Sequence, residues 1–396
     1  MPIFSQNKKG FCFFYTRAII FYMKVNQISL NQKNWNQGMA SIAIEPNLIM
    51  LFVSPDFEII DEVLSAIYLK YPDALVFGCS TAGEISNVTV TDKSISLTAI
   101  QFDKTSLKLV SVKLDSEVDS SKAGECIGNM LYKDDLKHVM VLSDGLNING
   151  ADLVSGLKSA LPNISVTGGL AADGEDFEKT FVIKNNQVLE KTVLGLGFYG
   201  DNLNVNYSSK GGWDGFGIER LVTKSKKNIL YELDGKPVLK LYKDLLGKDA
   251  EKLPSSGLLF PVSIRTSKKA KAVVRGLSGI NEADQSLIFG ANIPEGSYLR
   301  LMKGNVDKLI TGAEESAISV TQGLKETIEL VVLISCVGRR LVLKQLAEEE
   351  IDAVRNVIGD TSKITGFYSY GEIAPLNESL CELHHQTMTI TTLSEC

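Results

Sequence analysis

The chain has 396 residues, 44% of them hydrophobic and 22% charged, and a formal net charge of −6. This length allows two domains that each bury a full core, and the negative charge excludes a general attraction to nucleic acid or to an anionic membrane surface. The six cysteines show no paired spacing, which favours a reducing cytoplasm over a disulfide framework.

Residues 1–23 begin the chain with the apolar run "FCFFYTRAIIFY". Arg17 interrupts this run, which is too short to span a bilayer, and no small-residue cleavage site follows it. We therefore expect no membrane anchor. Residues 1–23 are expected to be a non-native upstream segment or disordered, with translation starting at Met23.

One structural unit recurs along the chain. In its first copy a buried strand (48–55) is followed by a helix (56–70) that begins behind Pro55, a second strand (74–78), a glycine corner (79–86) and an alternating strand (94–102). A close copy of this order is predicted at residues 330–393 and a looser copy at residues 138–200. A fourth copy is predicted at residues 256–303.

The repeated unit predicts an α/β fold, in which duplicated strand-helix-strand-corner-strand units form mixed sheets in two related domains. A glycine cluster after Tyr207 and the turn signal "LDGKPV" favour a domain boundary there. We place the N-terminal domain at residues 24–225 and the C-terminal domain at residues 226–396.

The segments "FGCSTAGEIS" (77–86) and "GFYSYGEIAP" (366–375) share a glycine corner that ends in Gly-Glu-Ile. Ligands of open α/β sheets bind at the carboxyl ends of strands, and glycines there let backbone N–H groups approach a ligand. The alternative is that these glycines only serve tight turns and that the acids cap backbone N–H groups. The candidate ligand-binding residues are Gly78, Cys79, Ser80, Thr81, Gly83 and Glu84 from the first corner, Glu372 from the last corner, and Gly169 and Asp173 from the glycine corner "VTGGLAADG" (166–174) between them.

Two further segments supply candidate ligand-binding residues. Asp144 lies in "SDGLNINGADL", which is similar to a phosphate-binding loop but lacks a Walker lysine and a dinucleotide spacing. Arg339 follows a buried strand in "SCVGRR", and its guanidinium suits a carboxylate or a phosphate; the alternative is a surface arginine.

Catalytic patterns are missing from the sequence. It has three histidines and none of the nucleophile-elbow, zinc-helix or kinase motifs. A hydrolase built from Cys79, Ser80 and Glu84 would lack a base. We therefore expect that the chain is not an enzyme.

The segment "CELHHQTMTITTL" places Cys381, His384 and His385 within five residues, as ligands for a soft metal or a haem iron. Adjacent strand residues point to opposite faces, so at most one histidine faces a given pocket. The alternative is a strand start whose histidines are only hydrogen-bonded.

Taken together, "VFGCSTAGEIS", "VTGGLAADG", "YELDGKPVLKLY", "FPVSI", "SCVGRR" and "GFYSYGEIAP" with "LHHQTMTITTL" resemble the landmarks of FIST proteins, named for F-box and intracellular signal transduction. The resemblance runs from about residue 30 to the end of the chain.

The resemblance implies a stand-alone bacterial sensory protein that binds a small ligand, such as an amino acid, between or within its FIST domains. It implies signalling in trans to a histidine kinase or a cyclic-di-GMP enzyme, and it is compatible with a homodimer. Some similar proteins bind haem, sense nitric oxide and restrain a partner kinase, which makes haem a candidate cofactor with His384 or His385 as its axial ligand. A small-molecule enzyme is the third alternative.

Overall fold

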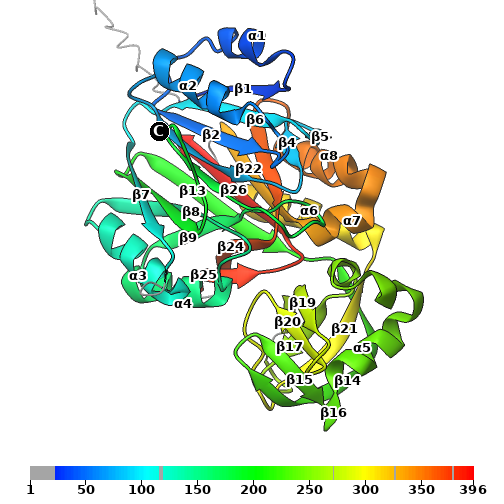
Figure 1. Ribbon diagram of the computed structural model, residues 1–396. Helices are drawn as coiled ribbons and strands as arrows, with labels where there is room; N and C mark the ends of the chain where they lie inside the picture. The colour runs from blue at the N-terminus through cyan, green and yellow to red at the C-terminus, as the bar shows by residue number, and fades with distance from the viewer. Residues whose placement is uncertain (1–22, 116–118, 271, 325–326, 377–378) are drawn as a thin grey trace, which may run out of the picture.

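The computed structural model describes residues 23–396, apart from residues 116–118, 271, 325–326 and 377–378. It has two parts (Figure 1). The body, residues 23–210 and 305–396, contains three six-stranded sheets with helices around them, and the small part, residues 213–304, is built on an antiparallel sheet. The predicted α/β class with mixed sheets is confirmed.

The first sheet of the body has the strand order β1-β6-β2-β3-β10-β11, in which β2 and β3 run parallel. Helices α1 and α2 cover its outer face, where apolar residues of both helices pack on β2 and β6. The bounds of these elements are β1 Lys24–Leu30, α1 Trp35–Ala40, β2 Leu48–Val53, α2 Ile60–Lys70, β3 Leu75–Ser80, β6 Ile95–Gln101, β10 Val182–Lys184 and β11 Gln187–Leu189.

The second sheet has the order β25-β24-β9-β8-β12-β7, with β8 and β9 parallel. Helices α3 and α4 pack on its outer face. Asn149 caps α4 by accepting hydrogen bonds from the backbone N–H groups of Ala151 and Asp152. The bounds are β7 Ser106–Lys113, α3 Ser120–Leu131, β8 Leu136–Ser143, α4 Gly150–Ala160, β9 Ser165–Leu170, β12 Thr192–Tyr199, β24 Gly371–Leu376 and β25 Ser379–His384.

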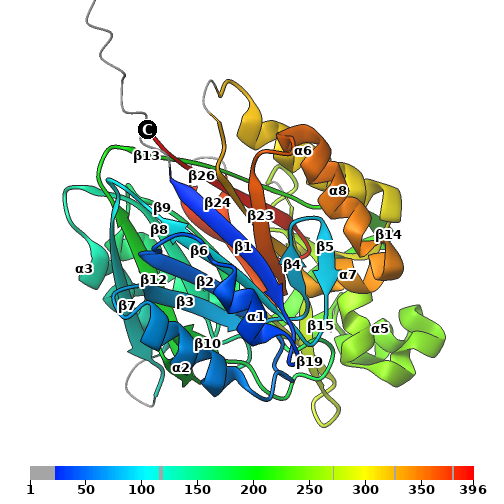
Figure 2. The same ribbon diagram turned by 90° about the horizontal axis from the view of Figure 1, so that it is seen from above.

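The third sheet has the order β13-β26-β22-β23-β4-β5, with β22 and β23 parallel. Figure 2 shows α6 and α8 side by side on its outer side and β4 and β5 beside β23. The bounds are β4 Glu84–Ser86, β5 Thr89–Thr91, β13 Leu203–Lys210, α6 Val306–Thr321, β22 Leu330–Cys336, α7 Val337–Leu343, η3 Lys344–Leu346, α8 Ala347–Ile358, β23 Lys363–Ser369 and β26 Met388–Glu395.

The inner faces of the three sheets enclose one common core. Phe52, Met140 and Ile334 reach it from β2, β8 and β22, and the rings of Phe52 and Phe367 lie 4.7 Å apart between centroids. Because helices cover the opposite faces, these three strands are buried on both sides. That explains continuous apolar runs such as "LIMLFV" where a half-exposed strand would alternate.

Each of the three predicted units gives a corner strand to a neighbouring sheet. The first unit contributes β4 to the third sheet beside β23, the second contributes β10 to the first sheet beside β3, and the third contributes β24 to the second sheet beside β9. The three units therefore form a closed ring in which every sheet is completed by another unit.

The small part corrects the prediction of a fourth unit at residues 256–303. The strand pairs described there are antiparallel, without the parallel pair of the other units, and several strands that follow one another in the chain pair directly where those units have a crossover helix. The bounds are β14 Trp213–Lys226, β15 Ile229–Leu233, β16 Lys236–Pro237, α5 Val238–Leu246, η1 Gly247–Lys252, η2 Ser255–Leu259, β17 Val262–Arg265, β18 Val273–Arg275, β19 Leu277–Asn281, β20 Ser286–Phe289 and β21 Tyr298–Gly304.

The domain boundary between residues 225 and 226 stays a prediction. It falls at the end of β14, and strands from the C-terminal region pair with strands from the N-terminal region in the second and third sheets. The expectation for residues 1–23 lies outside the described residues except at Met23, which is ordered and buried in the common core. Among the helices of the described residues, none has the length and apolarity that a bilayer crossing requires.

A glycine recurs in the second parallel strand of each unit, at Gly78, Gly168 and Gly366. A Cβ atom there would lie 2.0, 1.9 and 1.8 Å, respectively, from a carbonyl oxygen of the neighbouring strand. Gly168 and Gly366 also have φ angles of 149° and 159°, which side chains rarely adopt. The close approach of the parallel strands therefore requires glycine in every unit.

Gly366→Ala is expected to lower the free energy of unfolding by at least about 1–3 kcal/mol, because the methyl group would force β22 and β23 apart. Urea unfolding of the variant and the parent measures this loss. Gly279→Ala in β19 is the control, since its nearest neighbouring atom would be 3.5 Å from the new Cβ. Equal stabilities of the two variants would contradict the packing argument.

Candidate functional site

A cavity of about 380 Å³ lies between the body and the small part, and we call it the polar cavity. Several of the segments singled out in the sequence meet there, although they are distant along the chain. The residues that line it are Gly145, Leu146, Ile148, Leu170, Phe177, Asn228, Leu258, Gly276, Leu277, Ser278, Ile288, Phe289, Gly290, Cys336, Tyr370, His385 and Gln386.

His385 is buried in the wall of the polar cavity, directly after β25. Neither of its ring nitrogens has a hydrogen-bond partner among the described residues. Burial, with help from the nearby Arg275 and His384, lowers the pKa of His385 to about 3, so the imidazole is neutral. The small part approaches closely here, because a Cβ at Gly290 would lie 2.5 Å from His385 Nε2.

Gln386 is the second polar group of this wall. Its Nε2 donates to Leu258 O at 3.0 Å, and its backbone oxygen accepts from Trp213 Nε1 at 2.8 Å. Its Oε1 is buried and has no partner among the described residues. The backbone of Gln386 has a φ angle of 66°, an uncommon conformation that persists where the surroundings enforce it.

An aromatic pair forms another wall. The rings of Phe177 and Tyr370 stack with a centroid distance of 4.8 Å and an interplanar angle of 6°. Asp173 holds the pair in place: one carboxylate oxygen accepts from the Tyr370 hydroxyl, and the other accepts from the backbone N–H groups of Glu178 and Lys179 at 2.7 and 2.6 Å. Asp173, predicted as a ligand residue, thus positions the wall of the cavity.

Asp144 has a comparable position next to the cavity. Its carboxylate accepts hydrogen bonds from the backbone N–H groups of Leu146 and Lys191 at 2.9 and 2.7 Å and from the Thr180 hydroxyl at 2.9 Å. These bonds fix the loop after β8, which presents Gly145 and Leu146 to the cavity.

The N-terminal corner lies away from the polar cavity. Cys79 belongs to the common core, and the Ser80 hydroxyl accepts from the backbone N–H of Phe181 at 3.2 Å. Gly78 is the strand glycine described above, while Gly83 packs against the guanidinium of Arg340. These residues do not line the cavity.

Glu84 of this corner points inward and is fully hydrogen-bonded. The Thr81 hydroxyl donates to its Oε1 at 2.5 Å, and both the backbone N–H and the hydroxyl of Ser94 donate to its Oε2 at 3.2 and 2.6 Å. Burial raises the pKa of Glu84 to about 7 in spite of these bonds.

Glu372 repeats this arrangement in the C-terminal corner. The Ser369 hydroxyl donates to its Oε1 at 2.7 Å, and the backbone N–H and hydroxyl of Thr387 donate to its Oε2 at 3.2 and 2.9 Å. Burial raises the pKa of Glu372 to about 8. The two corners are thus equivalent, and their carboxylates tie the corner to the strand that follows it.

Gly169 and Arg339 are also packed inside the body. Gly169 pairs with Glu372 across β9 and β24. Arg339 is fully buried and forms an ion pair of 2.7 Å with Glu350, and its guanidinium also donates to the backbone oxygens of Gly211 and Leu309. Neither residue lines the polar cavity.

His384 lies beside His385 but away from the polar cavity, with its Nε2 3.1 Å from Ala374 O. Burial lowers its pKa to about 4. In the part of the chain that the structure describes, no group of three or more His, Cys, Asp and Glu side chains is arranged to hold a metal ion.

Sequence reasoning missed several cavity residues, above all Gln386, Phe177 and Tyr370. Gln386 and Tyr370 stand within quoted segments, but only the neighbouring histidines and the glycine corner were selected. Nothing in the sequence of residues 276–290 indicates that they face His385.

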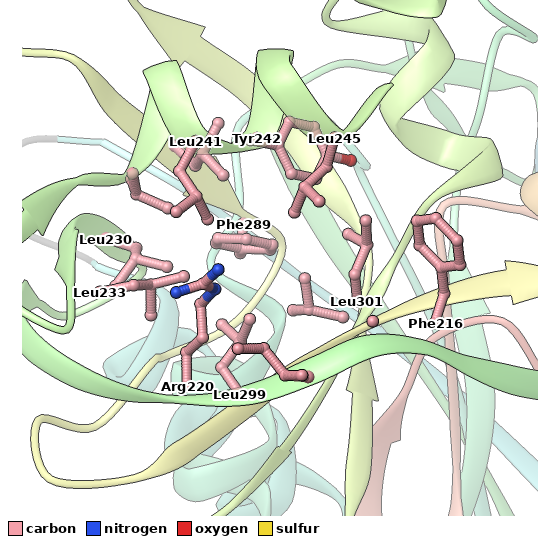
Figure 3. A pocket seen from close by; sticks show the side chains of 15 residues that line it. Phe216, Arg220, Leu230, Leu233, Leu241, Tyr242, Leu245, Phe289, Leu299 and Leu301 are labelled. Atoms are coloured by element: carbon pink, nitrogen blue, oxygen red, sulfur yellow. The ribbon is translucent and has the colours of Figure 1, made fainter. Parts of the chain in front are cut away.

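A second cavity, of about 60 Å³, lies inside the small part (Figure 3). Side chains of α5, including Leu241 and Leu245, face Leu233 and Leu299 across it, and the guanidinium of Arg220 points toward it. Arg220 is paired with Asp234 at 3.0 Å. This apolar cavity has no unpaired buried polar side chain, so the polar cavity is the better candidate for a specific ligand.

Comparison with known families shows two matches along the chain. Residues 47–236 match the FIST N domain and residues 239–375 match the FIST C domain. The chain belongs to the FIST family. FIST domains are sensory domains of signal transduction.

Curated FIST relatives give no further assignment. An uncharacterised protein of Methanocaldococcus jannaschii is 24% identical over 339 residues, which are 79% of this chain and 63% of that protein. An uncharacterised protein of Mycobacterium tuberculosis is 22% identical over 247 residues, 60% of this chain and 63% of that protein. The chain therefore matches less than two thirds of the length of either relative.

The expectation that the chain is not an enzyme is corrected by the solved structures. A cyanuric acid hydrolase from A. caulinodans matches 94% of this chain and 99% of its own at 7% identity and a TM-score of 0.37. A second cyanuric acid hydrolase structure matches 95% of this chain and 100% of its own at 8% identity and a TM-score of 0.35. Both of these structures are enzymes by name. Likeness at this level assigns no activity to the chain.

The buried carboxyl of Glu372 generates a prediction for pH-dependent stability. Because its folded pKa of about 8 exceeds the ordinary value of 4.5, its contribution is fully present below pH 4.5 and is lost as the pH rises through 8. Glu372→Gln removes the ionisation, and its amide can donate to the Ser369 hydroxyl. The free energy of unfolding of the parent should fall between pH 5 and pH 8 as Glu372 ionises. In the variant this fall should be smaller by about 3–5 kcal/mol.

Urea unfolding at a series of pH values measures this difference. Glu58→Gln, on an exposed side chain, is the matched control and should keep the pH dependence of the parent. If Glu372→Gln also kept it, Glu372 would ionise normally in the folded protein.

Proposed function

We propose that this FIST protein is a sensor whose small ligand binds in the polar cavity, and that another protein reads the bound state. One observation carries the proposal: His385 and Gln386 place buried polar atoms without partners in the wall of a cavity. Leaving such a group unpaired costs about 1–3 kcal/mol, and a ligand that hydrogen-bonds to it offsets that cost.

The position of the cavity supports a signalling role. Body residues such as Leu146 and Tyr370 form one side of it, and small-part residues such as Leu277 and Phe289 form the other. A ligand that contacts both sides favours the arrangement of the two parts that it fits best. A shift of the small part would then be the signal.

The proposal includes a partner in trans, either a histidine kinase or a cyclic-di-GMP enzyme, and a cytoplasmic location. Membership of the FIST family supports a signalling partner in trans. The cytoplasmic location is supported by the cysteines of the described residues, because unpaired thiols are typical of a reducing compartment. These free cysteines are Cys79, Cys126, Cys336, Cys381 and Cys396.

Screening by thermal shift against small metabolites, including amino acids, nucleobases, amides and carboxylates, tests the ligand site. We expect at least one compound to raise the unfolding temperature of the parent, since a ligand that binds only the folded state stabilises it. His385→Ala should abolish that shift. Leu245→Ala, which changes the apolar cavity, should preserve it. A hit that depends on Leu245 and not on His385 would place the ligand site elsewhere.

Haem is a second candidate ligand, and His385 favours it. A neutral imidazole without hydrogen-bond partners has the chemistry of an axial haem ligand. Gly290 packs against its Nε2, and the described lining residues include no Lys or Arg for the haem propionates, so haem would require the small part to move away from His385. Bound haem would supply an iron that binds nitric oxide, and the reading partner would then be a histidine kinase.

An absorption spectrum after reconstitution with haem tests this candidate. The expected result is a stoichiometric Soret band that moves when nitric oxide is added to the reduced protein. His385→Ala should lose the band and His384→Ala should keep it, because only His385 lines the cavity. A colourless protein after reconstitution would rule haem out.

A further inference from the structure

We infer that the ligand of the polar cavity is an uncharged, planar molecule with an N–H donor beside a C=O acceptor, such as a ring amide. This inference rests on the ligand site proposed above and adds the chemical class. It is carried by three properties of the cavity: its charge, its unpaired polar atoms and its flat aromatic wall.

Among the described residues, no charged side chain lines the cavity. None of the residues that line it is Asp, Glu, Lys or Arg, and His385 is neutral. A buried charge is stable only when it is paired. A free amino acid brings both an ammonium and a carboxylate, and the wall offers no side chain of opposite charge to either of them.

Arg275 is a buried cation close enough to His385 to lower the pKa of that imidazole, and its Nε has no hydrogen-bond partner among the described residues. Its Nη1 lies 3.2 and 3.4 Å from the backbone oxygens of Val274 and Leu383, and the carboxylate of Glu382 lies within its electrostatic reach. Arg275 is not among the residues that line the cavity. Its positive charge therefore discourages a cationic ligand in the cavity.

The unpaired atoms define the hydrogen bonds that the ligand has to make. Gln386 Oε1 accepts only, so the ligand needs a donor. Neutral His385 has one nitrogen that donates and one that accepts. A ring amide, with N–H and C=O side by side, can donate to Gln386 Oε1 and accept from the N–H of His385 without carrying a charge.

The remaining walls suit a flat molecule. The stacked rings of Phe177 and Tyr370 are held by Asp173, and Phe289 and Ile288 of the small part also line the cavity. Phe177 has a φ angle of 54°, a strained backbone conformation that is found at ligand-binding loops. Rigid aromatic walls bind planar rings by stacking, with little loss of side-chain freedom.

Two matched pairs of probes test the inference: uracil against orotate, and nicotinamide against nicotinate. Within each pair the ring is the same and only the second compound carries a carboxylate. Isothermal titration of the full chain is expected to show that the uncharged member binds at least tenfold more tightly in at least one pair. Tighter binding of orotate or nicotinate, with loss in His385→Leu, would overturn the inference and leave the ligand site intact.

His385→Leu separates a ligand role from a structural role. Because it removes two unpaired buried nitrogens, it should leave the unfolding temperature of the ligand-free protein unchanged or raise it. The same variant should bind uracil or nicotinamide at least tenfold more weakly than the parent. Leu245→Ala is again the control and should leave the affinity unchanged. A lower unfolding temperature with unchanged affinity would show that His385 is structural. If none of the four probes binds, the inferred ligand class is wrong, and the broader metabolite screen decides separately on the site.

Discussion

The fold depends on the pairing of corner strands between units. Each unit of the body makes its own parallel strand pair, but its sheet is extended by a strand from another unit: β10 beside β3, β24 beside β9 and β4 beside β23. A strand pair alone would expose an edge and half of its apolar surface, so each unit depends on the next one for its stability. The common core inside the ring, the helices outside it and the inward position of the corners all follow from this pairing.

The buried carboxylates stabilise the corners that make this pairing, whereas the polar cavity contains polar atoms that no such hydrogen bond occupies. Glu84 and Glu372 each accept one hydrogen bond from a hydroxyl of their own corner, and the others from a residue just before the strand that follows the corner. Asp173 hydrogen-bonds a loop and orders the aromatic wall beside it. His385 and Gln386 differ from these acids, because the strands around them are complete and their polar atoms still have no partner. The distinction separates the groups that build the fold from those available to a ligand.

The sequence predicted the class and the repeated unit because both are written in local patterns: apolar runs such as "LIMLFV", helix starts at Pro and Asp, and glycine corners. It found the corners, but it could not show that Glu84 and Glu372 turn inward, since their partners follow one strand later. The burial of Arg339 depends on Glu350, one helix further along, and on the backbone of residues 211 and 309. The cavity could not be predicted, because its two sides come from two parts of the structure whose sequence patterns are unrelated. The predicted fourth repeat was wrong, because short strands have the same sequence pattern in parallel and antiparallel sheets.

The pairing of β4 with β23 has a consequence for how the chain folds. Ser86 pairs with Thr365, so 365 − 86 = 279 residues separate two neighbours in one sheet. While the chain emerges from the ribosome, the N-terminal corner is complete long before its partner strand exists. Contacts of such sequence separation form late and make folding slow. The nascent chain therefore lacks the partner strand of β4 until residues 363–369 have been synthesised.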